Sequence, residues 1–250
     1  DEPGIIDVSD VGDKLILRLH GIATTSLIAA VQRVRGLFDL DASIDDVHQA
    51  LSRDTELARM LKTRPGIRVP GAWDGFELTV RAILGQQVSV RAATTMAGRV
   101  ANRYGQEIDV SVGGLQRVPN KLFPGPDKLR RARLETVGII GSRARSIRAV
   151  ARATADGQLC FDAAQDPEAF AEGLKLIPGI GDWTAQYVAM RALKSPDAFP
   201  AADLALLRAF DTEGRQRMKP AELLQRAEAW RPWRAYAALL IWGSPAGAGG

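Results

Sequence analysis

A glycine-rich turn in the second half of the chain has the residue types of an anion-binding site. Residues 176–193 read LIPGIGDWTAQYVAMRAL, in which the turn PGIG separates two segments with helical periodicity. Glycine adopts the positive φ angles that tight turns need, and it lets another backbone approach closely. The unpaired N–H groups at the start of the second helix favour an anion. The turn therefore fits a DNA phosphate, although the same residues would also serve as a plain connection between two helices.

An aspartate follows this turn at a spacing that allows two roles. Asp203 lies 20 residues beyond Trp183 and directly before the apolar run LALLRAF. As a helix N-cap, its carboxylate would accept hydrogen bonds from backbone N–H groups. As a carboxylate beside a reacting group, it would stabilise developing positive charge. The aspartate alone does not decide between these roles.

The composition excludes several classes of protein. The chain has 250 residues, of which 46% are hydrophobic and 25% charged, as in a globular protein of one large or two ordinary domains. Its single cysteine, Cys160, rules out an internal disulfide and a multi-cysteine metal site, and His20 and His48 are too far apart in the sequence to suggest a metal centre. No apolar run approaches the roughly 18–20 residues that cross a bilayer, and the first residues lack a signal-peptide pattern. We therefore expect a cytoplasmic protein with no membrane partner.

Basic residues are concentrated in one region. The formal net charge is +4, from 33 lysines and arginines against 29 acidic residues. Residues 121–152 contain only two acids, Asp127 and Glu135. The basic residues of this region are Lys121, Lys128, Arg130, Arg131, Arg133, Arg143, Arg145, Arg148 and Arg152. The region is either a solvated helical face or a surface that follows a phosphate backbone.

The pattern of the first 71 residues predicts a small α+β domain. The segment KLILRLH, residues 14–20, is typical of a strand, and an amphipathic helix is expected to begin at Ser26. SIDDVHQALSRD and TELARMLKT predict two short capped helices. Because one strand makes no sheet by itself, we expect the sequence before residue 1 to supply the domain's first strands. The Pro-Gly pairs in RPGIRVPGAW, residues 64–73, mark the boundary of this domain.

Residues 72–243 are predicted to form a helical domain. Two helices are expected between residues 75 and 105, with an interruption near Gly85-Gln86-Gln87 and a stop at Gly105, and a loop rich in glycine and proline over about 111–126. Further helices are expected at about 127–137, 142–155, 166–177, 182–194, 203–211 and 220–242. The tail, residues 244–250, is expected to be disordered.

Several of these segments resemble one family. LIPGIGDWTAQYVAMRAL, followed by an aspartate at this spacing, is similar to the helix-hairpin-helix, Gly/Pro…Asp superfamily of DNA base-excision glycosylases. RPGIRVPGAWDGFELTVRAILGQQVSV and AWRPWRAYAALLIW resemble its bacterial 3-methyladenine DNA glycosylase II type. The resemblance extends over residues 14–243. It implies a mostly α fold of two helical lobes, with lobe boundaries near residues 86 and 196, behind a small, truncated N-terminal α+β domain.

The resemblance also implies roles for individual residues. Asp203 falls on the catalytic aspartate, and Trp183, Tyr187, Trp242 and Leu204 fall on the base pocket. The DNA-binding hairpin would comprise Pro178, Gly179, Ile180, Gly181 and Thr184, and the backbone carbonyls of Ile177 and Ile180 would hold a monovalent cation, Na⁺ or K⁺. Gln87 occupies the position of a wedge that is leucine in better known members, and Leu204 replaces a frequent tyrosine. Trp183 stands where the lyase branch has a nucleophilic lysine, so no Schiff base is expected.

The implied activity is that of a monofunctional glycosylase in base excision repair. It would flip an alkylated, cationic purine such as 3-methyladenine out of duplex DNA and hydrolyse its N-glycosidic bond, leaving an abasic site. The chemistry requires no cofactor, and we expect a monomer that acts on nucleoid DNA. One alternative is a related glycosylase for a deaminated or oxidised base, which Gln87 and Leu204 favour. A catalytically inactive, lesion-binding DNA module and a helical interaction protein remain as further alternatives.

Overall fold

A two-stranded antiparallel sheet opens the chain. The computed structural model describes residues 3–108, 120–210 and 218–244. Strand β1 (Ile5–Val11) pairs with β2 (Lys14–His20), with Ile5 opposite His20 and Val11 opposite Lys14. The prediction of β2 is confirmed. Sequence analysis gave it no partner within the chain, because the polar residues of IIDVSDV interrupt the apolar alternation of β1.

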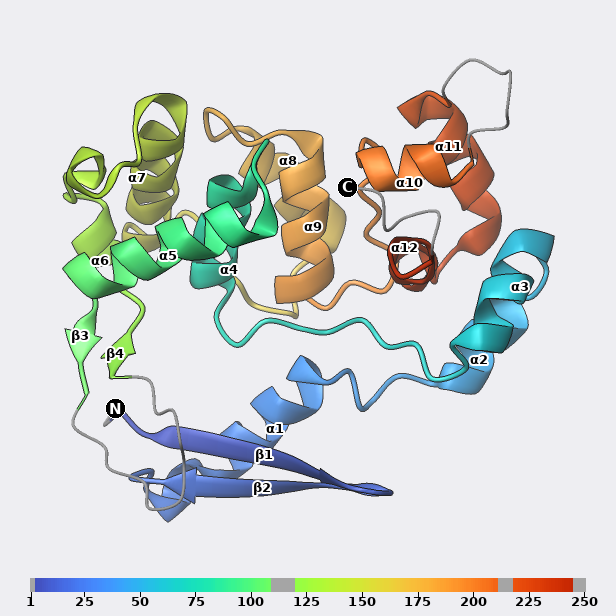
Figure 1. The fold of residues 1–250 in the computed structure, drawn as a ribbon, viewed down its shortest axis with the longest axis horizontal. Coiled ribbons are helices and arrows are strands. Elements are labelled where there is room, and N and C mark those ends of the chain that lie inside the picture. Colours follow the sequence, from blue (N-terminus) through green and yellow to red (C-terminus); the bar gives the residue numbers. More distant parts are fainter. Residues whose placement is uncertain (1–2, 109–119, 211–217, 245–250) are drawn as a thin grey trace.

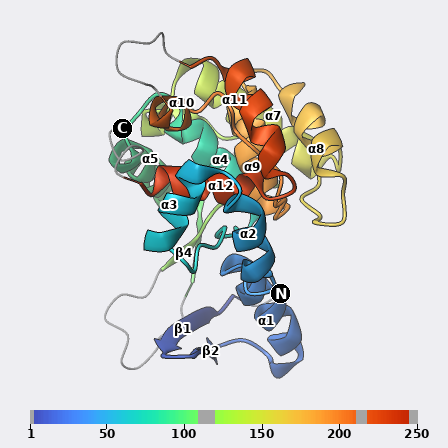
Figure 2. The same ribbon diagram turned by 90° about the vertical axis from the view of Figure 1, so that its right-hand side faces the viewer.

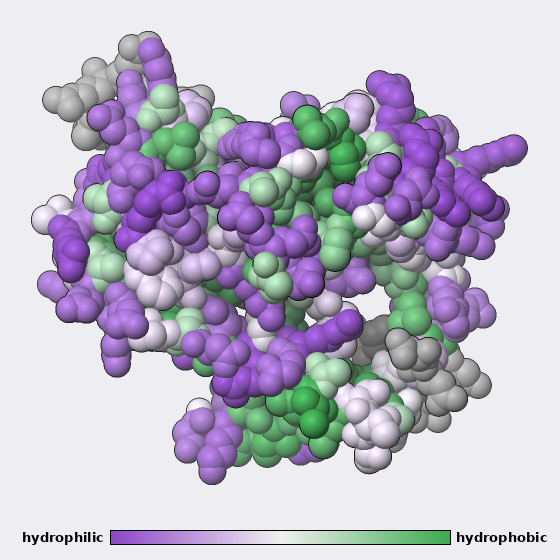
Figure 3. All heavy atoms as spheres, turned by 180° about the vertical axis from the view of Figure 1, so that it is seen from behind, coloured by the Kyte–Doolittle hydropathy of each residue, from purple (hydrophilic) through white to green (hydrophobic). Residues whose placement is uncertain are grey.

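Three helices follow the hairpin. Helix α1 (Leu27–Leu37) begins after a 3-10 turn, η1 (Thr24–Ser26), and Ser26 makes no side-chain capping bond. Helices α2 (Ile44–Leu51) and α3 (Thr55–Thr63) confirm the two predicted capped helices, with Ser43 and Asp54 as N-caps. Seen from behind, an apolar patch lies at the bottom of the view, in the part of the molecule formed by β1, β2 and α1 (Figure 3).

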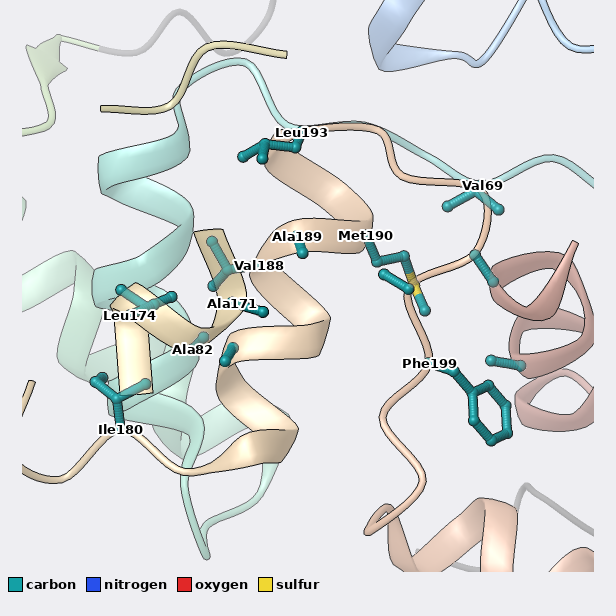
Figure 4. Close-up of a cluster of buried hydrophobic side chains, with 14 of the residues drawn as sticks. Val69, Ala82, Ala171, Leu174, Ile180, Val188, Ala189, Met190, Leu193 and Phe199 are labelled. Atoms are coloured by element: carbon teal, nitrogen blue, oxygen red, sulfur yellow. The ribbon is translucent and has the colours of Figure 1, made fainter. Parts of the chain in front are cut away.

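The centre of the molecule is a group of packed helices. Helix α4 (Gly75–Gly85) contacts α5 (Val90–Tyr104), α7 (Gly141–Ala155) and α9 (Asp182–Ala192), and α8 (Pro167–Lys175) packs on α9 (Figure 1). Ala82, Leu174, Ile180 and Val188 are buried where α4, α8 and α9 meet (Figure 4). The predicted interruption after Gly85 and the stop at Gly105 are confirmed.

A second group of helices lies beside α9. Helix α10 (Leu204–Ala209) packs on α12 (Arg234–Trp242), and α12 also packs on α3 (Figures 1 and 2). Helix α11 (Pro220–Ala227) lies between α10 and α12 in the sequence. The N-terminal helix α3 therefore packs against α12, the last described helix. Within the described ranges, no helix is long and apolar enough to span a membrane.

Some predicted helices are shorter than expected. The segment 127–137 contains α6 (Pro126–Leu129) and a 3-10 helix, η2 (Leu134–Val137), in place of one helix. The segment 220–242 is divided into α11, η3 (Glu228–Trp230) and α12, because Pro232 cannot donate a helical hydrogen bond. A small pair, β3 (Gln106–Glu107) and β4 (Lys121–Leu122), partly replaces the predicted loop. Residues 109–119 of that region, and the predicted tail beyond residue 244, lie outside the described residues.

Candidate active site

Asp203 accepts four hydrogen bonds at the start of α10. Its Oδ1 atom accepts the backbone N–H groups of Ala205 and Leu206 at 2.9 and 3.0 Å, so the N-cap role is real. Two indole N–H groups also reach the carboxylate, Trp242 Nε1 to Oδ1 at 3.0 Å and Trp183 Nε1 to Oδ2 at 2.7 Å. Among the described residues, no cationic side chain lies within 4.0 Å of it. The carboxylate is therefore held firmly, while no cation of the described residues pairs with its charge.

Aromatic rings from two helices surround this carboxylate. Trp183 and Tyr187, one turn apart on α9, stack with centroids 5.2 Å apart and planes 6° apart. Trp242 of α12 lies 6.5 Å from the Tyr187 ring at 57°. All three rings are half-buried, and Leu204 beside Asp203 is 56% exposed. The structure thus brings together the predicted carboxylate and the predicted pocket residues from positions 183 to 242 of the chain.

Arg191 belongs to the same aromatic face, and sequence reasoning missed it. Its guanidinium carbon lies 5.5 Å from the Tyr187 ring centroid, and its Nη1 donates to the Tyr187 hydroxyl oxygen at 3.2 Å. Trp183, Tyr187 and Arg191 are spaced four residues apart along α9. This helical spacing, which puts the three side chains on one face, is the signal that would have identified the arginine.

The predicted hairpin joins α8 to α9. Gly179 has φ +86°, and a Cβ atom there would lie 2.2 Å from Ser146 Oγ, so the position requires glycine. Ser146 Oγ donates to the Pro178 carbonyl at 2.7 Å and fixes the turn to α7. Ile180 is buried in the core, while Pro178 and Gly179 are exposed. Helix α9 has Gly181 as its N-cap, without a side-chain capping bond, which leaves its first N–H groups for another acceptor.

The loop between α4 and α5 is tied to this hairpin. Gln86 Nε2 donates to the Gly179 carbonyl at 3.1 Å and to Thr184 Oγ1 at 3.2 Å. Thr184 is only 2% exposed, so its hydroxyl serves this internal contact. The next residue, Gln87, is exposed and has φ +56°, a conformation that non-glycine residues seldom adopt. Gln86 thus holds the exposed Gln87 next to the hairpin, a link between distant segments that local sequence does not reveal.

Two protein-family models match the chain. Residues 1–74 match the AlkA N-terminal domain, and residues 80–235 match the HhH-GPD superfamily base excision DNA repair protein. The chain belongs to the HhH-GPD superfamily. The match includes the α8–α9 hairpin, Asp203 and most of the aromatic face described above.

Relatives and solved structures agree with this membership. The chain is 36% identical to a "Probable bifunctional transcriptional activator/DNA repair enzyme AlkA" of Mycobacterium tuberculosis, over 96% of this chain and 47% of the relative. It is 38% identical to the "DNA-3-methyladenine glycosylase 2" of Escherichia coli, over 82% of this chain and 68% of the relative. The chain thus spans about half of the mycobacterial relative's length. Its fold matches a 3-methyladenine DNA glycosylase structure from Archaeoglobus fulgidus with a TM-score of 0.79 at 20% identity, covering 94% of this chain and 80% of the other.

Proposed function

We propose that this chain is a monofunctional DNA glycosylase that removes alkylated, cationic purines such as 3-methyladenine from duplex DNA in base excision repair. The observation that carries the proposal is the unpaired Asp203 carboxylate, held by Trp183 and Trp242 beside a stacked aromatic pair. The name of the Escherichia coli relative supports the substrate class. We further propose that it acts as a monomer on nucleoid DNA in the cytoplasm.

The first step is extrusion of the damaged nucleotide. Base flipping costs a few kcal/mol, and less when the base is damaged. The hairpin around Gly179 would bind a backbone phosphate through N–H groups, while Gln87 would enter the space that the base leaves. The carbonyls of Gly179, Pro178 and Ile177 each accept a hydrogen bond, from Gln86, Ser146 and the Ile180 N–H group respectively. We assign a monovalent cation, when bound, to the carbonyls of Ile177 and Ile180 on the family resemblance, and it would add positive charge next to the phosphate.

The flipped base would then meet the aromatic face. A purine alkylated at a ring nitrogen carries a positive charge, and a cation over an aromatic ring gains about 0.5–2 kcal/mol. Trp183, Tyr187 and Trp242 supply such rings on α9 and α12. Selection by charge and stacking also tolerates several alkylated bases, because every base has a π face.

Cleavage of the glycosidic bond places positive charge on the sugar. The bond's electron pair leaves with the base and neutralises its charge, and water adds to the sugar carbon and loses a proton to solvent. Asp203 would stabilise the oxocarbenium-like state electrostatically, since no cationic side chain of the described residues neutralises it. Trp183 cannot form a Schiff base, so the DNA product would be an abasic site.

The test is release of free bases from methylated duplex DNA, separated by chromatography. We expect the wild type to release 3-methyladenine and Asp203→Asn to release it about 10²–10³-fold more slowly. Asparagine also caps helices, so the variant should keep its fold, but it loses one of the two indole hydrogen bonds, and release is therefore measured per folded molecule. Equal release by both proteins would remove Asp203 from the mechanism, and absence of release by the wild type would exclude the substrate.

One observation favours a second candidate, a glycosylase for a neutral deaminated or oxidised base. The Arg191 guanidinium lies against Tyr187, and its charge opposes a cationic base on that side of the pocket. The same chromatographic assay on duplexes that contain single deaminated or oxidised bases separates the two candidates. Release of those bases in preference to 3-methyladenine would favour the second one.

A further inference from the structure

The arginines of the protein divide into paired and unpaired groups. In the basic region that sequence analysis identified, Arg130 pairs with Asp127 and Asp156, and Arg148 pairs with Glu135. These cations therefore stabilise the fold instead of facing a ligand. By contrast, Arg91, Arg99 and Arg143 form no ion pair within the described part of the chain.

The three unpaired arginines line one hollow. It has a volume of about 450 Å³ and is lined by residues of α5, by the loop before α5 and by Arg143 near the start of α7. Ser89 and Thr95 add hydroxyl groups to its wall, and none of its lining residues is acidic. Arg91 and Arg99 are exposed, and Arg143 uses one Nη atom to hold the Gln86 carbonyl. The hollow therefore presents several guanidinium N–H groups that have no acceptor in the described part of the chain.

The position of the hollow relates it to the hairpin. Gln86 bonds to Gly179 on one side, and Val88 and Ser89 line the hollow on the other. The exposed Gln87 stands between them in the chain, so anions bound at both places would flank it. Val90, at the start of α5, is 84% exposed and leaves an apolar side chain in water next to the arginines. Such a surface suits the sugar-phosphate backbone, because guanidinium forks bind phosphate oxygens and sugars are partly apolar.

We infer that this hollow binds an internucleotide phosphate of duplex DNA, as a second anchor on the opposite side of Gln87 from the hairpin. The inference rests on the proposed function in one point, namely that the ligand is DNA. It does not depend on whether the protein releases a base. Arg91 and Arg99 supply the charge, and Arg143 joins the hollow to the loop that carries Gln87.

The experiment measures the affinity of the protein for a short undamaged duplex over a series of salt concentrations. Removing a phosphate contact reduces the slope of log K against log salt by about one. The double variant Arg91→Ala/Arg99→Ala should show this shallower slope and bind about tenfold more weakly at low salt. Arg91→Gln/Arg99→Gln keeps much of the side-chain stems and should behave in the same way, which separates the lost charge from lost packing.

A matched control removes the same charge elsewhere. Arg53 and Arg59 are exposed and form no ion pair among the described residues, and α2 and α3 lie at the opposite end of the molecule from α5 and α7 (Figure 1). Arg53→Ala/Arg59→Ala should leave the slope unchanged. A wild-type slope in both hollow variants, or the same loss in the control, would overturn the inference even if the wild type releases 3-methyladenine. If the two hollow variants show the predicted change of slope but the wild type releases no base, the result would contradict the proposed function and leave the phosphate site standing.

Discussion

Asp54 and Asp203 are built alike but differ in their counter-ion and in the number of indole N–H groups that they accept. Each caps a short helix by accepting two backbone N–H groups, and each accepts an indole N–H from a distant tryptophan. At Asp54 the donor is Trp230 Nε1 at 3.1 Å, and at Asp203 the donors are Trp183 and Trp242. Arg226 Nη2 lies 3.1 Å from Asp54, whereas Asp203 has no cation within 4.0 Å among the described residues.

The neutralising arginine separates a structural carboxylate from one that can act on a substrate. The Asp54 side chain is 15% exposed, and Trp230 is almost fully buried. Burial raises the pKa of Asp54, but the Leu57 N–H, Trp230 and Arg226 outweigh it and hold that pKa below its ordinary value. Around Asp203 the indoles are half-buried and face Tyr187. Because no counter-ion of the described residues pairs with it, its charge would be available to a cationic transition state under the proposed function.

Among substitutions that test the difference between the two aspartates, removal of the indole N–H donors to Asp203 should have the largest effect. Trp183→Phe/Trp242→Phe keeps aromatic rings but removes both N–H groups, and hydrogen bonds to charged groups contribute about 1.5–3 kcal/mol each. We expect base release in single-turnover assays to fall about 10–100-fold. Trp230→Phe is the matched control at Asp54, and it should lower stability without slowing release per folded molecule. Unchanged release in the double variant would show that the indoles do not position Asp203.

Removal of the cation from Asp54 should have a smaller effect, on stability. Arg226→Met keeps a long, unbranched apolar stem but removes the guanidinium group, which leaves the partly buried Asp54 carboxylate without its counter-ion. We expect the free energy of unfolding, measured in urea, to fall by about 1–2 kcal/mol, since the pair is partly exposed. Arg59→Met, at an exposed and unpaired site, should change it by less than about 0.5 kcal/mol. An equal loss of unfolding free energy in Arg226→Met and Arg59→Met would show that Arg226 does not stabilise the fold by neutralising Asp54.

The smallest effect should appear in the pH dependence of stability. The pKa of Asp54 is lowered in the folded state from an ordinary value of 3.8. Its contribution is therefore fully present above that value and is lost as the pH falls through the folded pKa. The difference in unfolding free energy between wild type and Asp54→Asn should shrink as urea titrations move below about pH 4. A difference that stays constant with pH would contradict this role.

Local patterns predicted much of the fold and of the site. The PGIG turn predicted the hairpin, and the apolar run after Asp203 predicted its N-cap role, because caps and turns depend on adjacent residues. The family resemblance supplied the catalytic role of Asp203 and the pocket residues Trp183, Tyr187, Leu204 and Trp242. Contacts between distant segments were not predictable, including Gln86 with Gly179 and the hollow lined by arginines of α5 and α7.

The two aspartates illustrate this limit most clearly. Both precede a short amphipathic or apolar helix, so the sequence near each one predicts the same N-cap. What distinguishes them is Arg226, which lies 172 residues from Asp54 in the chain. Tertiary packing alone brings this cation to Asp54 and leaves Asp203 without a cationic partner among the residues that the structure describes.

The most direct test of the account compares Asp54→Asn with Asp203→Asn in two measurements on each protein, 3-methyladenine release per folded molecule and the free energy of unfolding. Asp203→Asn should lose about 10²–10³-fold in release per folded molecule, and also some stability, because the asparagine NH₂ group cannot accept the indole N–H that one carboxylate oxygen accepts. Asp54→Asn should lose stability, because its ion pair with Arg226 is broken, and release the base at the wild-type rate. Wild-type release by folded Asp203→Asn would contradict the account and show that Asp203 is only a helix cap.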